Sequence, residues 1–165
     1  MPRTATRSAT KTRATRARRA PNAINLLTDD HAKVRKMFKQ FERMKEKMDD
    51  SEKAELVQQI CMELTLHAQV EEEIFYPAAR EALEEQDLLD EAEVEHASAK
   101  ELISQLQSMG PGDDLYDAKV TVLGEYVEHH VKEEEKQMFP KVRKAKLDLE
   151  YLAEQIQERK EQAMQ

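Results

Sequence analysis

Two stretches of the chain, residues 67–77 and residues 130–140, share a spacing of histidine, glutamate and proline that suits metal binding. In each stretch a glutamate follows the first histidine by four residues, and a proline ends the stretch. Residues i and i+4 lie on one face of a helix, so each stretch can direct an imidazole and a carboxylate toward the same point. The ligand pairs are His67 with Glu71 and His130 with Glu134.

Two further histidines complete a doubled pattern. His31 precedes His67 by 36 residues, and His96 precedes His130 by 34 residues. The chain therefore reads as a lone histidine followed by His-x-x-x-Glu, twice over. Side chains on facing helices of a four-helix bundle build metal sites of this kind. The candidate metal ligands are His31, His67, Glu71, His96, His130 and Glu134.

A single histidine on an apolar helix face is usually an ordinary core residue, but six ionisable side chains on core faces are not. A buried, ionised carboxylate without a partner costs several kcal/mol, and two that face each other also repel. Metal ions remove both penalties. Imidazole and carboxylate without thiolate suit iron, manganese or zinc. Two His-x-x-x-Glu units suit two ions with bridging glutamates and terminal histidines, and iron is the ion we favour.

The elements that must position these residues are helices. The chain has 3 glycines, 5 prolines and no tryptophan, and 36% of its residues are charged, which favours an all-α protein over a sheet. Apolar residues recur at intervals of three and four, which predicts an up-and-down four-helix bundle with a short extra C-terminal helix. We expect helices at about 22–48, from Ser51 as a cap to Tyr76, from 88 to the break at 110–112, from there to Pro140, and from 147 to the end, with a short helical piece at 78–85. Pro77 and Pro140 are expected to end or kink their helices.

Length and composition predict one folded domain, residues 22–165, preceded by a disordered basic tail, residues 1–21. The tail holds seven basic residues and no acidic one, which leaves 19 of the 26 basic residues against all 34 acidic ones in the bundle. The bundle surface is therefore a poor nucleic-acid binder. The tail could be an appendage without a dedicated role, a weak nucleic-acid or polyanion arm, or a transit peptide.

A cytoplasmic location is expected from three observations. The single cysteine, Cys61, excludes an intrachain disulfide and suits a reducing compartment. No apolar run approaches the roughly 18 residues of a membrane span. No secretory signal pattern is found at the start of the chain.

The pattern of six ligands resembles the hemerythrin-like, or HHE cation-binding, family. The resemblance covers about residues 23–151 and includes the aromatic-proline endings Phe75-Tyr76-Pro77 and Met138-Phe139-Pro140. It implies a four-helix bundle with a non-haem di-iron centre. It also implies that His31, His67, His96 and His130 bind terminally and that Glu71 and Glu134 bridge the two irons.

Two departures from the oxygen-carrying hemerythrins bear on function. Those proteins have a fifth histidine four residues after the one that matches His96, where this chain has Lys100. Their second carboxylate also follows the last histidine by five residues, against four here. Each iron would then keep open or water-filled positions. The resemblance therefore favours a site that binds, senses or reacts with oxygen, peroxide or nitric oxide in a stress response over a reversible carrier. An iron-holding protein without turnover and an enzyme that decomposes peroxide or nitric oxide are the alternatives.

Several neighbours of the ligands are candidates for additional site residues. We expect His129 to lie at the surface beside the helix seam, Tyr126 to pack rather than reach the metals, and Glu63 to be solvated or to pair between helices. We expect the other glutamates of the two stretches to be solvated: Glu72, Glu73, Glu133 and Glu135. Oligomeric state remains open at this level.

Overall fold

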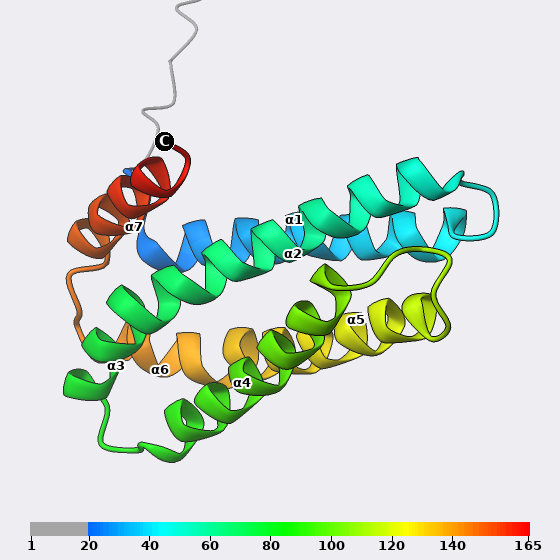
Figure 1. Ribbon diagram of the computed structural model, residues 1–165. Coiled ribbons are helices and arrows are strands. Elements are labelled where there is room, and N and C mark those ends of the chain that lie inside the picture. The colour runs from blue at the N-terminus through cyan, green and yellow to red at the C-terminus, as the bar shows by residue number, and fades with distance from the viewer. Residues whose placement is uncertain (1–19) are drawn as a thin grey trace, which may run out of the picture.

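The computed structural model describes residues 20–165, and every regular element within that range is helical (Figure 1). The α-helices are α1 (Ala23–Met44), α2 (Asp50–Val70), α3 (Tyr76–Ala82), α4 (Asp87–Gln107), α5 (Tyr116–Glu133), α6 (Phe139–Lys144) and α7 (Leu149–Ala163). Two π-helical turns join them, η1 (Glu71–Phe75) between α2 and α3 and η2 (Glu134–Met138) between α5 and α6. The predicted disordered tail falls almost entirely on residues 1–19, outside the described residues.

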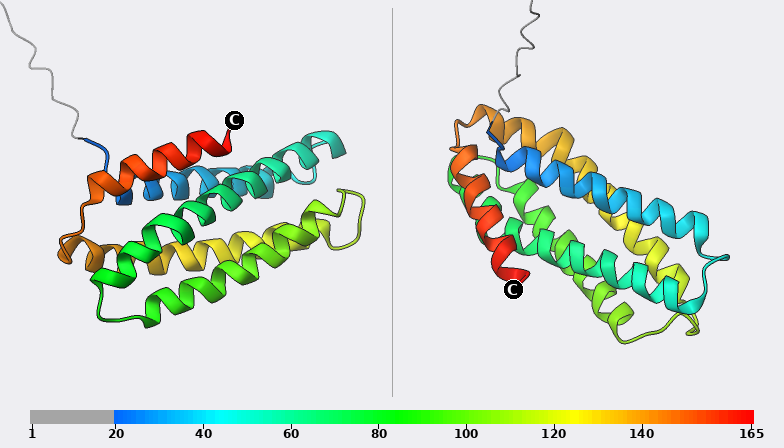
Figure 2. Two further views of the ribbon diagram at one scale, coloured as in Figure 1. Left: turned by 60° about the vertical axis from the view of Figure 1, so that its left-hand side comes forward. Right: turned by 90° about the horizontal axis from the view of Figure 1, so that it is seen from above.

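Four long helices form the bundle that the sequence predicts. α1 packs against α2 and α5, and α4 packs against the same two helices, so the four lie around one central axis. α7 is the expected extra helix, and it lies across α1, α2 and η1 at one end of the bundle (Figure 2). Among residues 20–165, no helix combines the length and the apolar character that a membrane crossing requires.

Side-chain caps mark the first residues of three helices, α1, α2 and α7. Asn22 accepts a hydrogen bond from the Asn25 N–H at the start of α1. The cap of α2 is Asp49, which accepts from the Glu52 N–H, so the expectation of Ser51 as the cap was wrong. A carboxylate is favoured here because it both accepts the free N–H and lies at the positive end of the helix dipole.

The part of the prediction that has the helices end at Pro77 and Pro140 is wrong. Each helix instead widens into a π-turn before its proline and then continues, as α3 and α6. The η1 turn closes with a hydrogen bond from the Tyr76 N–H to the Glu71 carbonyl, five residues earlier. This widening leaves each proline at the first turn of the following helix, where its missing N–H is tolerated.

The core divides into two apolar clusters with a polar layer between them. One cluster lies toward α7 and includes Ile24, Phe75 and Ile156, and the other lies toward the opposite end and includes Phe41 and Leu123. Along α1, α2 and α4 the candidate histidine falls where one cluster gives way to the other, and on α5 it directly precedes Val131, the last residue of the second cluster. The six polar side chains thus lie between two layers of apolar residues.

Candidate metal centre

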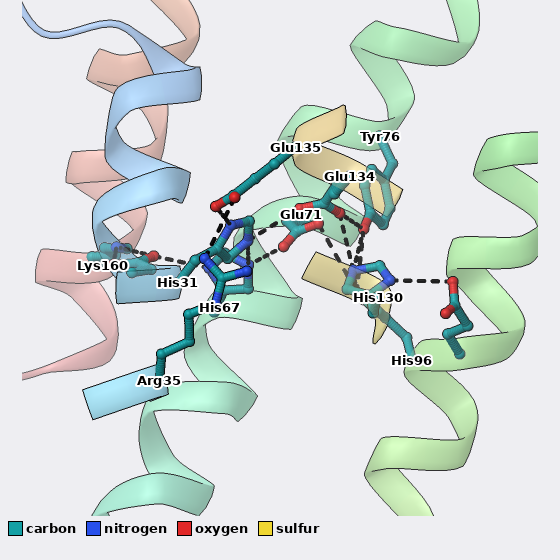
Figure 3. Close-up of polar contacts among 12 residues, drawn as sticks. His31, Arg35, His67, Glu71, Tyr76, His96, His130, Glu134, Glu135 and Lys160 are labelled. Atoms are coloured by element: carbon teal, nitrogen blue, oxygen red, sulfur yellow. Dashed lines mark hydrogen bonds and ion pairs between the residues drawn. The ribbon is translucent and has the colours of Figure 1, made fainter. Parts of the chain in front are cut away.

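The six predicted ligands converge in the centre of the bundle, and each side chain belongs to a residue that is at most 9% exposed (Figure 3). Their nitrogen and oxygen atoms form two groups, and within each group the atoms lie within 4.8 Å of one another. We call these the first position and the second position. The first position consists of His31, His67, Glu71 and Glu134, and the second of His96, His130, Glu71 and Glu134. Both glutamates belong to both positions, which is the arrangement of a bridged pair.

The imidazoles turn their Nε2 atoms toward the centre. The two Nε2 atoms lie 3.2 Å apart in the pair His31 and His67, and also 3.2 Å apart in the pair His96 and His130. The opposite ring nitrogen, Nδ1, faces a carboxylate at the outside of the site. Since a carboxylate oxygen only accepts, an Nδ1 bonded to it carries the ring proton and leaves a lone pair on Nε2.

Three of these outer carboxylates accept hydrogen bonds directly. The Nδ1–H of His31 donates to Glu135 at 3.0 Å, and that of His67 donates to Asp30 at 2.9 Å. The Nδ1–H of His130 donates to Glu95 at 3.3 Å. Hydrogen bonds of this kind hold an imidazole in the orientation and tautomer that a metal needs.

The two shared carboxylates, Glu71 and Glu134, have unmet bonding capacity that metal ions would satisfy. Both oxygens of Glu71 and Oε1 of Glu134 are fully buried and receive no hydrogen bond from the described residues. Burying a carboxylate in this state is costly, and two divalent cations between these oxygens and the Nε2 lone pairs would remove the cost. The residues present therefore fit a pair of metal ions.

Two of the four histidines, His67 and His130, have raised pKa values. Burial lowers the pKa of His67, but the adjacent Glu71 and the bond to Asp30 outweigh it and raise that pKa to about 10. Burial likewise lowers the pKa of His130, but Glu134 outweighs it and raises the pKa to about 11. Metal binding at neutral pH must therefore displace protons from both histidines.

Three further candidate ligands, Glu134, Glu71 and His96, also have shifted pKa values. Burial raises the pKa of Glu134, but His130 and His31 outweigh burial, and the pKa lies well below its ordinary value. The pKa of Glu71 is raised by burial and by the nearby Glu134 charge. Burial, together with the charge of His130, lowers the pKa of His96 to about 3, so His96 is neutral.

Tyr76 is a site residue that sequence reasoning missed. Its hydroxyl donates a short hydrogen bond to Oε2 of Glu134, and its oxygen lies 3.2 Å from Nε2 of both His96 and His130 (Figure 3). Burial and Glu134 raise the pKa of Tyr76 well above its ordinary value, so the phenol keeps its proton and acts as a donor.

The π-turn explains why Tyr76 was missed. Tyr76 follows His67 by nine residues, which on a continuous α-helix is about 900°, or about 180° from the histidine. The π-turn absorbs one extra residue and reduces that angle to roughly 80°, which brings Tyr76 to the ligand side. The available signal was Pro77, whose missing N–H disturbs the helical hydrogen bonds near Tyr76.

The equivalent residue in the second stretch is Phe139. It follows His130 by nine residues, as Tyr76 follows His67. The Phe139 ring stacks on His31 with an interplanar angle of 1° and a centroid distance of 5.9 Å. The first position is therefore closed by an apolar ring, whereas the second receives a hydroxyl.

For the other neighbours of the ligands, the structure confirms some of the expected positions and contradicts one. Tyr126 is 49% exposed and Glu63 pairs with Lys33 at 2.5 Å, so both lie outside the centre as expected. His129 lies at the surface as expected, with its side chain 68% exposed. The expectation that Glu135 is solvated was wrong, because it bonds to His31.

Asp30 and Glu95 are partners of the histidines that the sequence pattern does not predict. Asp30 directly precedes His31 and Glu95 directly precedes His96, so each lies one residue away from a ligand. A carboxylate next to a ligand on the chain points to a neighbouring helix, and this adjacency was the available signal. Lys100 contacts Glu72 at 2.5 Å and does not take part in the centre.

Comparison with known proteins decides the family. Residues 22–142 match the family described as hemerythrin HHE cation binding domain. The chain belongs to the hemerythrin HHE cation-binding family. The HHE domain binds metal cations, in agreement with the two groups of histidine and glutamate ligands.

Two individual proteins resemble this HHE chain. A "DNA nickase" from Nostoc sp. is 30% identical over 122 residues, which is 74% of this chain and 34% of that protein. This chain thus spans about a third of the length of that relative. The crystal structure of a hemerythrin HHE cation binding domain-containing protein from Mycobacterium kansasii has a TM-score of 0.71 and 24% identity, and the match covers 86% of each chain. That structure shares the fold.

Proposed function

We propose that this HHE domain holds two iron ions and that the pair binds, senses or reacts with oxygen, peroxide or nitric oxide in a stress response. One observation carries the proposal. Two pairs of histidines converge on two buried glutamates, and each glutamate belongs to both groups of ligand atoms. Bridging carboxylates with terminal imidazoles are donors that suit iron, although manganese and zinc accept the same donors.

Iron bound here would supply redox chemistry with small oxidants, and the protein would supply positioning. The Nδ1 bonds to Asp30, Glu95 and Glu135 hold three imidazoles in place. Tyr76 offers a proton donor next to Glu134. A preorganised donor of this kind stabilises negative charge that develops on a neighbouring oxygen.

A mainly apolar cavity gives small molecules access to the centre. It has a volume of about 320 Å³ and touches all four histidines, and its walls include Leu64, Ile103 and Val127. An apolar passage of this size admits neutral molecules such as oxygen, nitric oxide and hydrogen peroxide more readily than ions, because ions lose hydration there. The cavity therefore supports a small neutral reactant.

Lys100 argues against a dedicated reversible oxygen carrier. It occupies the chain position of the carriers' fifth histidine, and its ammonium group contacts Glu72 instead of the centre. Fewer imidazoles at the second position leave more room for an exogenous ligand on that ion. We therefore place a reactive or sensing role ahead of carriage, with an iron-holding role as the alternative.

Metal analysis with spectroscopy tests the proposal. Protein from iron-replete cells is analysed for metal, and its visible spectrum is recorded before and after anaerobic reduction and the addition of oxygen, peroxide or nitric oxide. Two irons per chain with bands that bleach and return support the proposed centre. Many turnovers per chain would favour an enzyme, and unresponsive but exchangeable iron would favour storage. An absence of metal from a correctly folded bundle would overturn the proposal.

Contact with nucleic acid through residues 1–21 is a second, separate candidate. Those residues hold seven basic side chains and no acidic one, and a relative carries the name DNA nickase. Charge alone would give weak binding that falls steeply with salt. We expect duplex DNA to bind the full chain at low salt and to lose that binding when residues 1–21 are removed, as measured by fluorescence anisotropy. Equal binding by both forms would exclude the tail as the contact.

A further inference from the structure

A repeated arrangement surrounds the four buried histidines. Beyond the Nδ1 atom of each histidine lies a carboxylate, and three of these four carboxylates also contact a lysine or arginine. Glu135 is contacted by Arg35 at 3.4 Å, and Asp30 by Lys160 at 2.6 Å. The series of histidine, carboxylate and cation is His31–Glu135–Arg35, His67–Asp30–Lys160 and, with a longer first separation of 3.8 Å, His96–Glu72–Lys100.

The fourth series lacks its cation. Glu95 accepts from the Nδ1–H of His130 through Oε1, as the pattern requires. Its other oxygen, Oε2, is buried and receives no hydrogen bond. Within residues 20–165, no lysine or arginine forms an ion pair with Glu95, and its outward neighbour is the imidazole of His129, with Nε2 at 3.6 Å from Oε2. A positive charge is therefore missing at the place where the other three series have one.

The residues beside Glu95 are metal ligands by type and spacing. His129 and Glu133 are separated by four residues on α5, which repeats the His-x-x-x-Glu spacing of the buried pair one residue earlier. Their side chains meet at 3.4 Å, and one atom each from Glu95, His129 and Glu133 lies within 4.8 Å of the others. The three residues come from two packed helices, α4 and α5, so their relative positions are fixed by the bundle.

The surroundings of this group favour a hydrated cation. The three residues line an open groove of about 690 Å³, whose other walls include Glu91 and Asp90, the latter paired with Arg80 at 3.0 Å. Among residues 20–165, no lysine or arginine lines that groove. Acidic walls raise the local concentration of cations, and open space leaves room for the water molecules that complete the coordination of an ion with three protein ligands.

We propose that Glu95, His129 and Glu133 form an outer site for a divalent cation, distinct from the buried pair. One imidazole and two carboxylates suit zinc, manganese or iron(II). The ion takes the place that Arg35, Lys160 and Lys100 hold in the other three series. Glu95 then lies between the outer ion and His130, so it links an exposed site to the second position of the buried centre.

Zinc stoichiometry tests the proposal directly. The full chain is stripped of metal, dialysed against micromolar free zinc and analysed for zinc and protein. We expect the wild type to bind one zinc more per chain than either His129→Ala or Glu133→Gln. The matched control is Glu125→Gln, which removes an exposed glutamate one turn before His129 and should bind as many ions as the wild type. Equal zinc content in the wild type and both site variants would overturn the outer site.

The buried centre can be separated from the outer site in the same experiment. If the outer site exists, the wild type should hold one zinc ion more per chain than His129→Ala, whatever the number of buried ions. Combining His129→Ala with Glu71→Gln should lower the zinc content by the sum of the two single losses. The His129 ring signals in an NMR spectrum should shift on zinc addition in the Glu71→Gln variant. Unmoved signals would mean that His129 acts only as a surface imidazole beside Glu95, and would refute the site.

Discussion

At the first metal position the Phe139 ring stacks on His31, whereas at the second position the Tyr76 hydroxyl lies 3.2 Å from Nε2 of both His96 and His130. Phe139 and Tyr76 occupy equivalent places in the two repeated stretches, each after a π-turn. The two repeated stretches therefore give a centre with a hydroxyl group on one side and an apolar ring on the other. A single hydroxyl group accounts for that difference.

The charge around the two positions differs as well. Asp30, behind His67, is contacted through both of its oxygens by Lys160 of α7, at 2.7 and 2.6 Å. Burial raises the pKa of Asp30, but the bonds to His67 and Lys160 outweigh burial and lower it. In the part of the chain that the structure describes, Glu95, behind His130, has no such lysine and pairs only with His129 and His130. The first position is thus tied to the C-terminal helix, and the second faces the acidic groove.

The largest effect is expected where the two positions meet. Glu71→Gln removes a carboxylate that belongs to both ligand groups, so at least one of the two proposed buried ions should be lost. Metal content per chain measures this, and Glu63→Gln, which alters a glutamate paired with Lys33, is the control. Full occupancy of both positions in Glu71→Gln would refute a bridging role.

The pH dependence of the metal-free protein should reveal the paired histidines. The pKa values of His67 and His130 are raised to about 10 and about 11, against an ordinary value of 6.5. The stability from their ion pairs is therefore fully present below pH ~6.5 and is lost as the pH rises through about 10 to 11. The pKa of His96 is lowered to about 3, so its contribution has the opposite sign and is lost as the pH falls below ~6.5.

Urea unfolding of the metal-free protein between pH 5 and pH 11 measures that dependence. The free energy of unfolding should decline at the alkaline end, and His67→Gln should flatten part of the decline. A wild-type profile that stays level between pH 8 and pH 11 would contradict the paired arrangement of these histidines.

The contact between Asp30 and Lys160 of α7 should affect metal affinity at the first position alone. Asp30→Ala removes the acceptor of the His67 Nδ1–H, and changes of this kind lower metal affinity by about 10- to 100-fold. Lys160→Met leaves that hydrogen bond in place and should act in the same direction but more weakly. Chelator competition for iron(II) measures both variants, with Lys33→Met as the control on an exposed pair. An Asp30→Ala variant with unchanged affinities at both positions would disprove the link.

Removing the hydroxyl should make the two positions alike. Tyr76→Phe removes one of the two donors to Oε2 of Glu134, since Nε2 of His130 also lies 3.0 Å from that oxygen, and a hydrogen bond to a charged group contributes about 1.5–3 kcal/mol. We expect a loss of that size in the free energy of unfolding of the metal-free protein, measured by denaturant titration. Tyr151→Phe, at an exposed tyrosine, should change stability by less than about 0.5 kcal/mol. Equal values for the two variants would show that the Tyr76 hydroxyl has no structural role.

The sequence by itself determined the helices, the fold class and the six side chains that meet at the centre. The i to i+4 spacing of His67 with Glu71 and of His130 with Glu134 is local, so it holds wherever those helices lie. The apolar seams then required the helices to face one another, and burial of the six residues followed. Their role as metal ligands remains a prediction for the metal analysis to test.

Only the tertiary structure decided what surrounds those six residues. Tyr76 reaches the centre because the extra residue of the π-turn changes its angular position around the helix axis. The regular helical period does not predict this change. Asp30, Glu95 and Glu135 act on histidines of other helices, and such pairs depend on how the helices rotate and slide against each other. The missing cation beside Glu95 is visible only when all four histidines are compared in space, because the four series are formed across helices and not along the chain.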